Sequence, residues 1–417
     1  MLFIDECNLA EWEPLLPRAE VSAMVLPGRE YTLNDIARGN GLDPDRCFKL
    51  AIQYSEQFDY IIGECSGAFL WHAVFRLTGD RTPFVIIPRY NHFYPPHAYA
   101  MLLSSQLRQH RDRVYTGCSA AGRAFSLFGF QCEPSYLPGL DLGSFRVLAS
   151  SKKSLCPLLG LPVDRDILLY TGRVADDKNI LGLLNAFGKV KLCRRAELVI
   201  CYHFFRQAYL DQCTERARSI GNVRLIYRPG LEALVGYYNA ADIFVSAAVS
   251  TFETFGRSPV ESMACGTPPV VPCYNGFRET VPPGAGFLVP LASGGNRKRV
   301  DPDRFVETVV TSLGDRQGLM ERREVGIQRA KNFARERILE ALLTDLVSAS
   351  SQEGGTLQVT QNLCLEGYPY EVCELWPSIE GRPLAELVCN FIRSGTLPAW
   401  PEKEAVDDFV TSWFAEF

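Results

Sequence analysis

The stretch DILLYTGRVADDKNILGLLNAFGKVK, from Asp166 to Lys191, joins an apolar strand to an amphipathic helix. The strand runs directly into Gly172 and Arg173, and Lys178 follows at the start of the helix. A strand end, a glycine and two cations beside a helix N-terminus are how an α/β domain holds a diphosphate. A solvated loop whose acidic residues only cap the helix is the alternative interpretation of this segment.

The same alternation of strand and helix continues as far as Pro290. The segments are AELVICYHF, QAYLDQCTERARSIG, NVRLIYRPG, LEALVGYYNAA, DIFVSAAVS, GRSPVESMACG, TPPVVPCY and GFLVP. Short apolar strands that alternate with helices are typical of βαβ units and predict a parallel, doubly wound sheet. Two helical segments follow, DPDRFVETVVTSLGD and the run from Leu319 to Ala349. We therefore predict a Rossmann-like domain over residues 155–345.

The first half of the chain repeats this pattern less regularly. DYIIGECSG, TPFVIIPRY and DRVYTGCS have the composition of buried strands, and HAYAMLLSSQLRQHRD that of a helix. We predict a second Rossmann-like domain over residues 1–150. Ligands of open α/β sheets bind at the carboxyl ends of the strands, so two such domains predict a cleft between them.

The segment 351–417 differs from both domains, because it is rich in acidic residues and carries aromatic, helix-like stretches such as EAVDDFVTSWFAEF. We expect a small, mostly helical or winged-helix-like extension. Its acidic balance argues against DNA binding, and packing on the body of the protein, on a partner or on a second copy of the chain is the expected role.

Composition excludes several classes of protein. A formal charge of −5 and a pI near 5.7 argue against a main partner that is nucleic acid or anionic lipid. No segment approaches the roughly 18 uninterrupted apolar residues of a membrane span, and the N-terminus lacks the pattern of a signal peptide. The 14 cysteines are scattered without a C-x-x-C pair, which favours reduced thiols over a zinc site. We predict a cytoplasmic protein.

A second motif, ETFGRSPVESMACGTPPVV, begins at Glu253 and contains a short helix. The backbone amides around Phe255, Gly256 and Arg257 form the start of that helix, which is a ready site for phosphate. Carboxylates would repel an anion there, so we expect Glu253 and Glu261 to accept hydrogen bonds from sugar hydroxyls. The alternative is that Glu261 only pairs with Arg257 at i,i+4.

These motifs in order are similar to those of a large enzyme family. TGRVADDKNILGLLNAF, YYNAADIFVSAAVSTFETFGRSPVESMACGTPPVV, NGFRETV and GFLVP resemble the retaining, nucleotide-sugar-dependent glycosyltransferases of the GT-B fold (glycosyltransferase family 4-like, glycosyl transferases group 1). DRVYTGCSAAGRAF and LPGLDLGSF support the resemblance in the first half. The resemblance implies two Rossmann-like domains that face a cleft, and it implies a hexosyltransferase-type enzyme.

The resemblance also implies roles for individual residues. Arg173 and Lys178 would hold the donor diphosphate beside Gly172, and Glu253 would contact hydroxyls of the transferred sugar. Glu261 would contact the ribose, and the backbone of Phe255, Gly256 and Arg257 would support the phosphates. The resemblance implies that the acceptor attacks from the face that the diphosphate leaves, without a protein nucleophile. It also implies that no metal or other cofactor is required.

Some residues depart from the family's pattern. No glycine-rich loop follows MLFIDECN. Family members often carry a histidine after the strand that corresponds to TPFVIIP. Here Arg89 is nearest in spacing, and we name His92 as the candidate catalytic histidine, with an ordinary surface-loop histidine as the alternative. Tyr202 and His203 stand where the family usually has glycines, so they are expected to reshape the base pocket.

Our leading hypothesis is transfer of a sugar from a nucleoside diphosphate to an acceptor hydroxyl of a soluble metabolite or glycan. One alternative is a sugar-nucleotide epimerase, which would convert its substrate without an acceptor. Another is a catalytically weak subunit that binds sugar nucleotides, whose binding role would survive the loss of turnover. The donor base, the donor sugar and the acceptor are not specified by these motifs.

Overall fold

The computed structural model describes residues 2–4, 12, 24–25, 44–55, 57–64, 67–89, 101, 104–105, 107–126, 130–135, 139–250, 253–292 and 299–350. His92 and the segment 351–417 lie outside these residues. The chain divides into two compact units. Among the described residues, the first unit holds those up to 135 together with 338–350, and the second unit holds 139–337.

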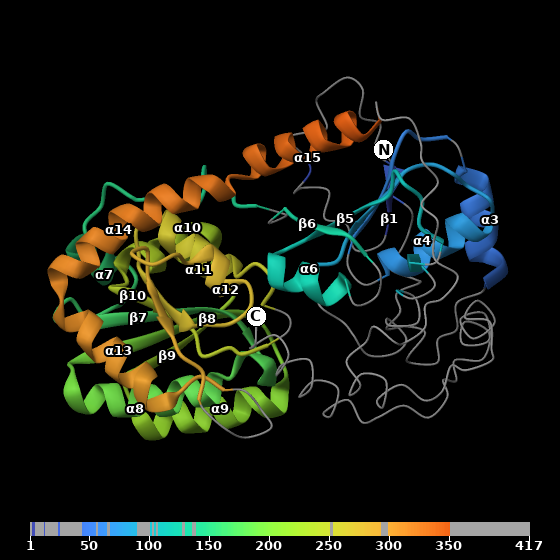
Figure 1. Cartoon of the computed structure of the whole chain (residues 1–417). Helices are drawn as coiled ribbons and strands as arrows, with labels where there is room; N and C mark the ends of the chain where they lie inside the picture. The colour runs from blue at the N-terminus through green and yellow to red at the C-terminus, as the bar shows by residue number, and fades with distance from the viewer. Residues whose placement is uncertain are drawn as a thin grey trace. The chain divides into compact units, whose positions relative to one another are not determined.

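The second unit is built on one parallel sheet (Figure 1). Its strands are β7 (Asp166–Val174), β8 (Ala196–Phe205), β9 (Val223–Tyr227), β10 (Ile243–Val245), β11 (Pro269–Pro272) and β12 (Phe287–Val289). They lie in the order β12-β11-β10-β7-β8-β9. The chain therefore starts in the middle of the sheet, extends it to one edge, and returns to extend it to the other. This is the doubly wound order predicted from the alternation of strands and helices.

Helices cover both faces of this sheet (Figure 1). They are α7 (Lys152–Leu158), η3 (Asp176–Lys178), α8 (Ile180–Cys193), α9 (Gln207–Ile220), α10 (Leu231–Ala240), α11 (Arg257–Ala264), α12 (Phe277–Thr280), α13 (Pro302–Gly314) and α14 (Arg316–Ala330). The apolar sides of α8, α9 and α13 meet one face in a common core, while α10 and α11 lie on the other. The central strands β7, β10 and β11 are largely buried on both faces, which explains their continuous apolar runs, whereas the edge strand β9 is only partly buried.

The last predicted helix, residues 319–349, is broken in the structure. It consists of α14, the short 3₁₀ helix η4 (Lys331–Phe333) and α15 (Arg335–Ser350). At the break, Ala334 pairs with Leu140 in a parallel bridge: the Leu140 amide donates to the Phe333 carbonyl at 2.7 Å, and the Arg335 amide to the Leu140 carbonyl at 2.9 Å. The helical pattern of the sequence is overridden here because backbone groups find partners in a distant segment.

The first unit contains a second parallel sheet in the order β2-β1-β3-β4-β5-β6. Its strands are β1 (Leu2–Ile4), β2 (Met24–Val25), β3 (Ile61–Glu64), β4 (Phe84–Ile87), β5 (Arg113–Thr116) and β6 (Cys132–Pro134). Its helices include α3 (Pro44–Tyr54), α4 (Ala68–Leu77) and α6 (Ser119–Ser126). The C-terminal part of α15 belongs here too, since the Tyr60 hydroxyl donates to the Leu346 carbonyl at 2.6 Å. The predicted α/β fold with two Rossmann-like units is confirmed.

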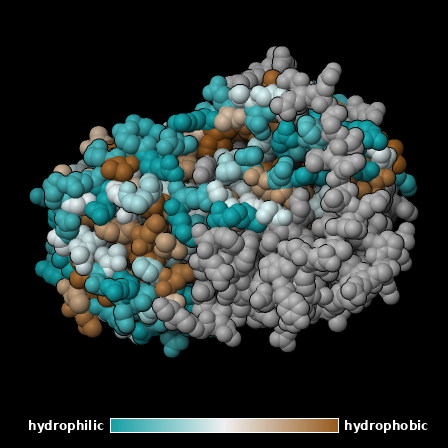
Figure 2. Space-filling model, in the orientation of Figure 1, coloured by the Kyte–Doolittle hydropathy of each residue, from teal (hydrophilic) through white to brown (hydrophobic). Residues whose placement is uncertain are grey.

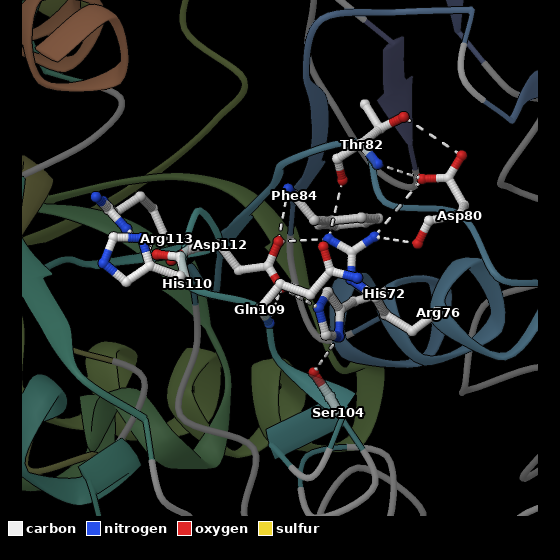
Figure 3. A network of polar contacts seen from close by, with 10 residues as sticks. All are labelled: His72, Arg76, Asp80, Thr82, Phe84, Ser104, Gln109, His110, Asp112 and Arg113. Atoms are coloured by element: carbon white, nitrogen blue, oxygen red, sulfur yellow. Dashed lines mark hydrogen bonds and ion pairs between the residues drawn. The ribbon is translucent and has the colours of Figure 1, made fainter. Parts of the chain in front are cut away.

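A buried polar network crosses the first unit between α4 and the start of β5 (Figure 3). Asp112 is its centre: it accepts from the Phe84 amide at 2.9 Å and the Gln109 amide at 2.7 Å, and it contacts the Arg76 guanidinium. His72 Nε2 lies 3.0 Å from the same carboxylate. Burial alone would raise the pKa of Asp112, but its contacts with His72 and Arg76 hold that pKa well below its usual range.

The side chains of Ser104, His72 and Asp112 are hydrogen-bonded in series, as they are in a hydrolase triad. Ser104 Oγ lies 2.8 Å from His72 Nδ1. Ser104 and His72 are, however, 0% exposed, and the carboxylate is also bound to Arg76. A nucleophile must reach its substrate, so this network is part of the core. Its role is to satisfy buried polar groups and to fix α4 against the sheet.

The face seen in Figure 2 is mainly hydrophilic over the second unit, with hydrophobic residues in smaller groups between polar ones. Some large apolar side chains stand out singly, among them Leu158 and Leu192. In the described part of the chain, no helix has the length and apolar character needed to cross a membrane.

Candidate functional site

The candidate site lies at the carboxyl ends of β7 and β10, which are neighbours in the second sheet. β7 connects onward to β8 on one side, while β10 connects to β11 on the other. The two loops that leave these strands therefore separate in opposite directions. In doubly wound sheets such a switch point is where ligands bind. Both motifs singled out in the sequence are at this point.

The end of β7 is shaped by Gly172 and Tyr170. A Cβ at Gly172 would lie 2.7 Å from the Tyr170 hydroxyl oxygen, so only glycine fits. That hydroxyl donates to the Arg173 carbonyl at 2.9 Å, and the Arg173 guanidinium donates to Asp177 at 2.7 Å. The arginine side chain is 35% exposed. It is thus held at the edge of the sheet with its charge accessible to a ligand.

Lys178 joins the loop after β7 to the loop after β10 through an ion pair with Glu253. The Lys178 and Glu253 side chains are each only 13% exposed. Asn179, in the left-handed conformation, accepts from the Gly182 amide at 3.2 Å and donates to the Ala247 carbonyl at 3.2 Å. The start of α8 is thereby tied to the end of β10. The structure brings together Lys178 and Glu253, which lie 75 positions apart in the sequence.

The loop that carries Glu253 rests on the loop before α12. The Gly276 amide donates to the Glu253 carbonyl at 3.1 Å. A Cβ at Gly276 would collide with the Thr254 carbonyl oxygen. Gly256 has φ 76°, and a Cβ there would lie 2.7 Å from the Phe277 ring. Close approach of the two loops, and hence the position of Glu253, therefore requires both glycines.

Gly276→Ala is expected to destabilise the protein by about 1–3 kcal/mol, because the added methyl group must push the Glu253 loop away. Gly188→Ala is the control: this glycine lies inside α8, its Cβ would meet only Ile220 at 3.8 Å, and alanine favours helix. Urea unfolding should show destabilisation for the first variant and none for the second. Equal stability of the two variants would mean that the loops are not in close contact.

Glu261 lies one turn into α11, and both of its carboxylate oxygens have partners. Arg257 Nε donates to one oxygen at 3.1 Å, so the predicted i,i+4 pair is present. The Tyr238 hydroxyl donates to the other at 2.8 Å and lies 2.5 Å from the Thr171 hydroxyl. Burial, and then Glu261, raise the pKa of Tyr238 well above its usual range, so it stays a hydrogen-bond donor. The contact of Glu261 with ribose stays a prediction.

The N-terminus of α11 faces the end of β7, since the Ser258 hydroxyl donates to the Thr171 carbonyl at 3.0 Å. Its first amides carry the partial positive charge of a helix start. The Phe255 side chain instead packs in the core against Phe333, with ring centroids 5.4 Å apart. What Phe255 offers to a ligand is its backbone. Its ring anchors the loop.

Sequence reasoning missed two groups. Tyr238 carried no signal, because it is one of several apolar-face residues of α10. In the first unit, Arg89 binds Glu64 through bonds of 2.7 Å and 3.0 Å, and the Trp12 indole donates to the same carboxylate at 2.9 Å. Glu64 ends β3 and Arg89 follows β4. The sequence feature that could have predicted this contact is the position of Glu64 and Arg89 at the ends of neighbouring parallel strands. Among the described residues, no group of three or more His, Cys, Asp or Glu side chains could hold a metal ion.

Residues 157–296 match the family described as glycosyl transferases group 1. The matched span runs from α7 to the residues after β12 and contains every site residue described above for the second unit. The second unit belongs to the glycosyl transferases group 1 family. The first unit lies outside the matched residues.

Curated proteins that are similar to this chain include enzymes of several names. It is 31% identical over 248 residues to D-inositol 3-phosphate glycosyltransferase 1 of Catenulispora acidiphila, a match that covers 56% of each chain. It is 33% identical over 137 residues to alpha-monoglucosyldiacylglycerol synthase of Streptococcus pneumoniae, covering 31% of this chain and 30% of that enzyme. The chain thus spans little more than half the length of the first relative and about a third of the second.

Solved structures agree with the fold across both units. Anabaena HepE in complex with UDP has a TM-score of 0.67 at 17% identity, covering 83% of this chain and 99% of that one. The same protein in complex with UDP-glucose gives a TM-score of 0.66 over the same shares. At this identity the similarity establishes the GT-B type of fold for this chain.

Proposed function

We propose that this chain is a retaining glycosyltransferase that moves a sugar from a nucleoside diphosphate to an acceptor hydroxyl. The observation that carries the proposal is the convergence of Arg173, Lys178 and Glu253 at the switch point of a group 1 domain. Family membership of the second unit and glycosyltransferase names among its relatives support it. The donor's negative charge and its hydroxyl groups each find suitable partners here.

In this mechanism Arg173 and Lys178 bind the diphosphate, and the start of α11 adds the partial charge of its amides. The negative charge on the leaving diphosphate grows as the glycosidic bond breaks, so preorganised cations stabilise the transition state more than the ground state. Glu253 accepts hydrogen bonds from the transferred sugar, and Glu261 from the ribose. The acceptor hydroxyl attacks from the face that the diphosphate leaves, and a diphosphate oxygen takes its proton.

The proposal includes the absence of a metal requirement, since two cations and a helix start supply the positive charge. Activity should therefore be unchanged by EDTA. We further propose a cytoplasmic location, which is consistent with the reduced thiols of described cysteines such as Cys156, Cys201 and Cys213. The acceptor is proposed to be a soluble metabolite or glycan. Inositol phosphate is the first compound to test, because a relative carries that name, and diacylglycerol, from the name of another relative, is the lipid whose preferential use would contradict a soluble acceptor.

A thermal-shift screen against UDP, GDP, dTDP and ADP sugars tests donor binding. A ligand at 100 times its Kd is expected to stabilise the folded state by about 2.7 kcal/mol. UDP-glucose is the first choice, because the HepE structure holds it. The best binder is then incubated with and without an acceptor panel. Conversion of a nucleotide sugar without acceptor would favour an epimerase, and binding without turnover would favour a binding subunit. Failure to bind any nucleotide sugar would overturn the proposal.

A further inference from the structure

Three basic residues lie side by side at the carboxyl edge of the second sheet. Gly172 pairs with Tyr202, and Tyr202 pairs with Tyr227, in the parallel ladders of β7, β8 and β9. The residue that follows each of these three in the sequence is basic: Arg173, His203 and Arg228. The row continues the candidate site away from β10, across the two strands on the other side of β7.

The row coincides with an irregularity in the ladder. After Gly172 opposite Tyr202, the next pair on β7 and β8 is Val174 opposite Phe205. One residue of β7 therefore faces two of β8, which is the count of a β-bulge. Bulges re-aim side chains at the edges of sheets and next to sites. Here the bulge falls on Arg173 and His203.

The imidazole projects from the sheet face that carries α10 and α11. Thr171 pairs with Cys201, and Thr171 bonds Tyr238 of α10 on that face. Alternation is regular up to Tyr202, which packs on the opposite face, so His203, the first residue of the bulge, follows on the face of Cys201. The same face carries Arg257, the first residue of α11. His203 is exposed, whereas Tyr202 before it packs into the core on the other face.

The charged groups that act on His203 are all cations. Partial burial lowers the pKa of His203, and Arg173 of β7, Arg228 after β9 and Arg257 of α11 lower it further. The carboxylates nearest to these arginines are engaged with them: Asp177 binds Arg173, and Glu261 binds Arg257. The Arg228 guanidinium lies over the Tyr227 ring at 5.2 Å. Such a site favours an anion, and an anion would favour protonation of the imidazole.

We propose that His203 is a proton-linked contact for the diphosphate of the donor, which it binds in its protonated, cationic form. The proposal rests on the function proposed above. The family usually has a glycine at this position, and a glycine could not supply a cationic side chain. As a consequence of this contact, the affinity for the donor depends on pH. The sugar donor itself has both phosphates esterified and does not titrate near neutral pH, so the proton is taken up by the protein.

The direction of the effect follows from linkage. In the free protein the pKa of His203 lies below its ordinary value of about 6.5, so the ring is neutral at pH 8. A bound diphosphate raises that pKa. Between the pKa of His203 in the free protein and its pKa in the complex, binding takes up a proton. Affinity therefore rises as pH falls through this range, and it levels off below the pKa of the free protein. A rise of one pKa unit on binding gives up to about tenfold tighter binding.

The experiment is calorimetric titration with UDP-glucose, or with the nucleotide sugar that gives the largest thermal shift, from pH 5.5 to 8.5. For the unaltered chain we expect about 3- to 10-fold tighter binding at the acidic end. His203→Gln should show the alkaline affinity at every pH, and His203→Arg, a permanent cation, should show the acidic affinity at every pH. Arg228→Gln should bind more weakly at alkaline pH and shift the pH dependence to higher pH, because it removes one of the cations that lower the pKa of His203.

His110→Gln, in the first unit, is the matched control and should keep the full pH dependence. The proposal is overturned if the unaltered chain binds with pH-independent affinity, or if His203→Gln keeps the dependence. Either result would leave the proposed glycosyltransferase function standing, because donor binding is still measured. If no nucleotide sugar binds at any pH, the proposed function is overturned, and the His203 proposal with it.

Discussion

Replacing Lys178 by alanine is expected to lower kcat/KM about 10²- to 10³-fold, which is the usual cost of losing one preorganised group that stabilises developing charge. The Lys178 side chain is 13% exposed and ion-paired with Glu253, so its charge is held in place before a donor arrives. Alanine removes the cation that we propose faces the leaving diphosphate, and it removes the ion-pair partner of Glu253. The measurement is steady-state kinetics with the donor found by the thermal-shift screen.

Lys189→Ala is the matched control for this prediction. Lys189 lies on α8, the helix that begins two residues after Lys178, but it is 58% exposed and pairs only with exposed Asp303 among the contacts described. It should keep the kinetics of the unaltered chain, because exposed ion pairs contribute little. A Lys178→Ala loss below threefold would contradict the proposed role. The double variant Lys178→Ala/Glu253→Gln separates two roles: a loss no larger than that of the worse single variant would mean that Lys178 acts by positioning Glu253.

Replacing Asp112 by alanine is expected to destabilise the fold by about 3–5 kcal/mol, the usual cost of breaking a buried ion pair. Asp112 accepts hydrogen bonds from the Arg76 guanidinium and the Phe84 amide, and it lies beside His72. Without it these buried donors lose an acceptor. Urea unfolding measures the difference. Asp303→Ala, which breaks an exposed pair, is the control and should change stability by less than about 0.5 kcal/mol.

The stability of the protein at acidic pH should depend on the same buried network around Asp112. The pKa of Asp112 is lowered in the fold, so its stabilising contribution is present above the ordinary carboxyl pKa of about 4 and is lost as pH falls through the lowered value. Burial lowers the pKa of His72, so the unfolded chain takes up that proton first and stability falls below about pH 6.5. Asp112 itself raises the pKa of His72, so the comparison is made in a His72→Asn background, where adding Asp112→Ala should reduce the loss of stability between pH 5 and 3. A parallel loss in both proteins would contradict the account.

The fold of the second unit was predictable because local pattern and tertiary structure agree. The strand predicted from DILLYTGR is β7, and the helix predicted from NILGLLNAFGKVK is α8. Buried parallel strands must be apolar throughout, and the helices between them need one apolar side, so both are visible in the sequence. DIFVSAAVS forms only the short strand β10, because its later residues turn into the loop that carries Glu253.

The candidate site was predictable in part. Arg173 lies at the end of a strand, Lys178 and Glu253 follow strand ends, and the carboxyl ends of parallel strands lie on one edge of the sheet. The ion pair between Lys178 and Glu253 was not predictable, since it depends on the separation of two loops. The second partner of Glu261 was not predictable either. Tyr238 reaches that carboxylate from α10, and nothing in the spacing of the two residues indicates the contact.

The sequence alone determined two doubly wound α/β units, the edge of the second sheet at which chemistry is expected, and the residue types available there. These features depend on periodicity and on strand ends, which are local. Only the tertiary structure decided which groups meet: Lys178 with Glu253, Tyr238 with Glu261, and Arg173 with His203 and Arg228 in one row. Strand order, register and the bulge in β8 determine those contacts. These features follow from packing between segments that lie far apart in the chain.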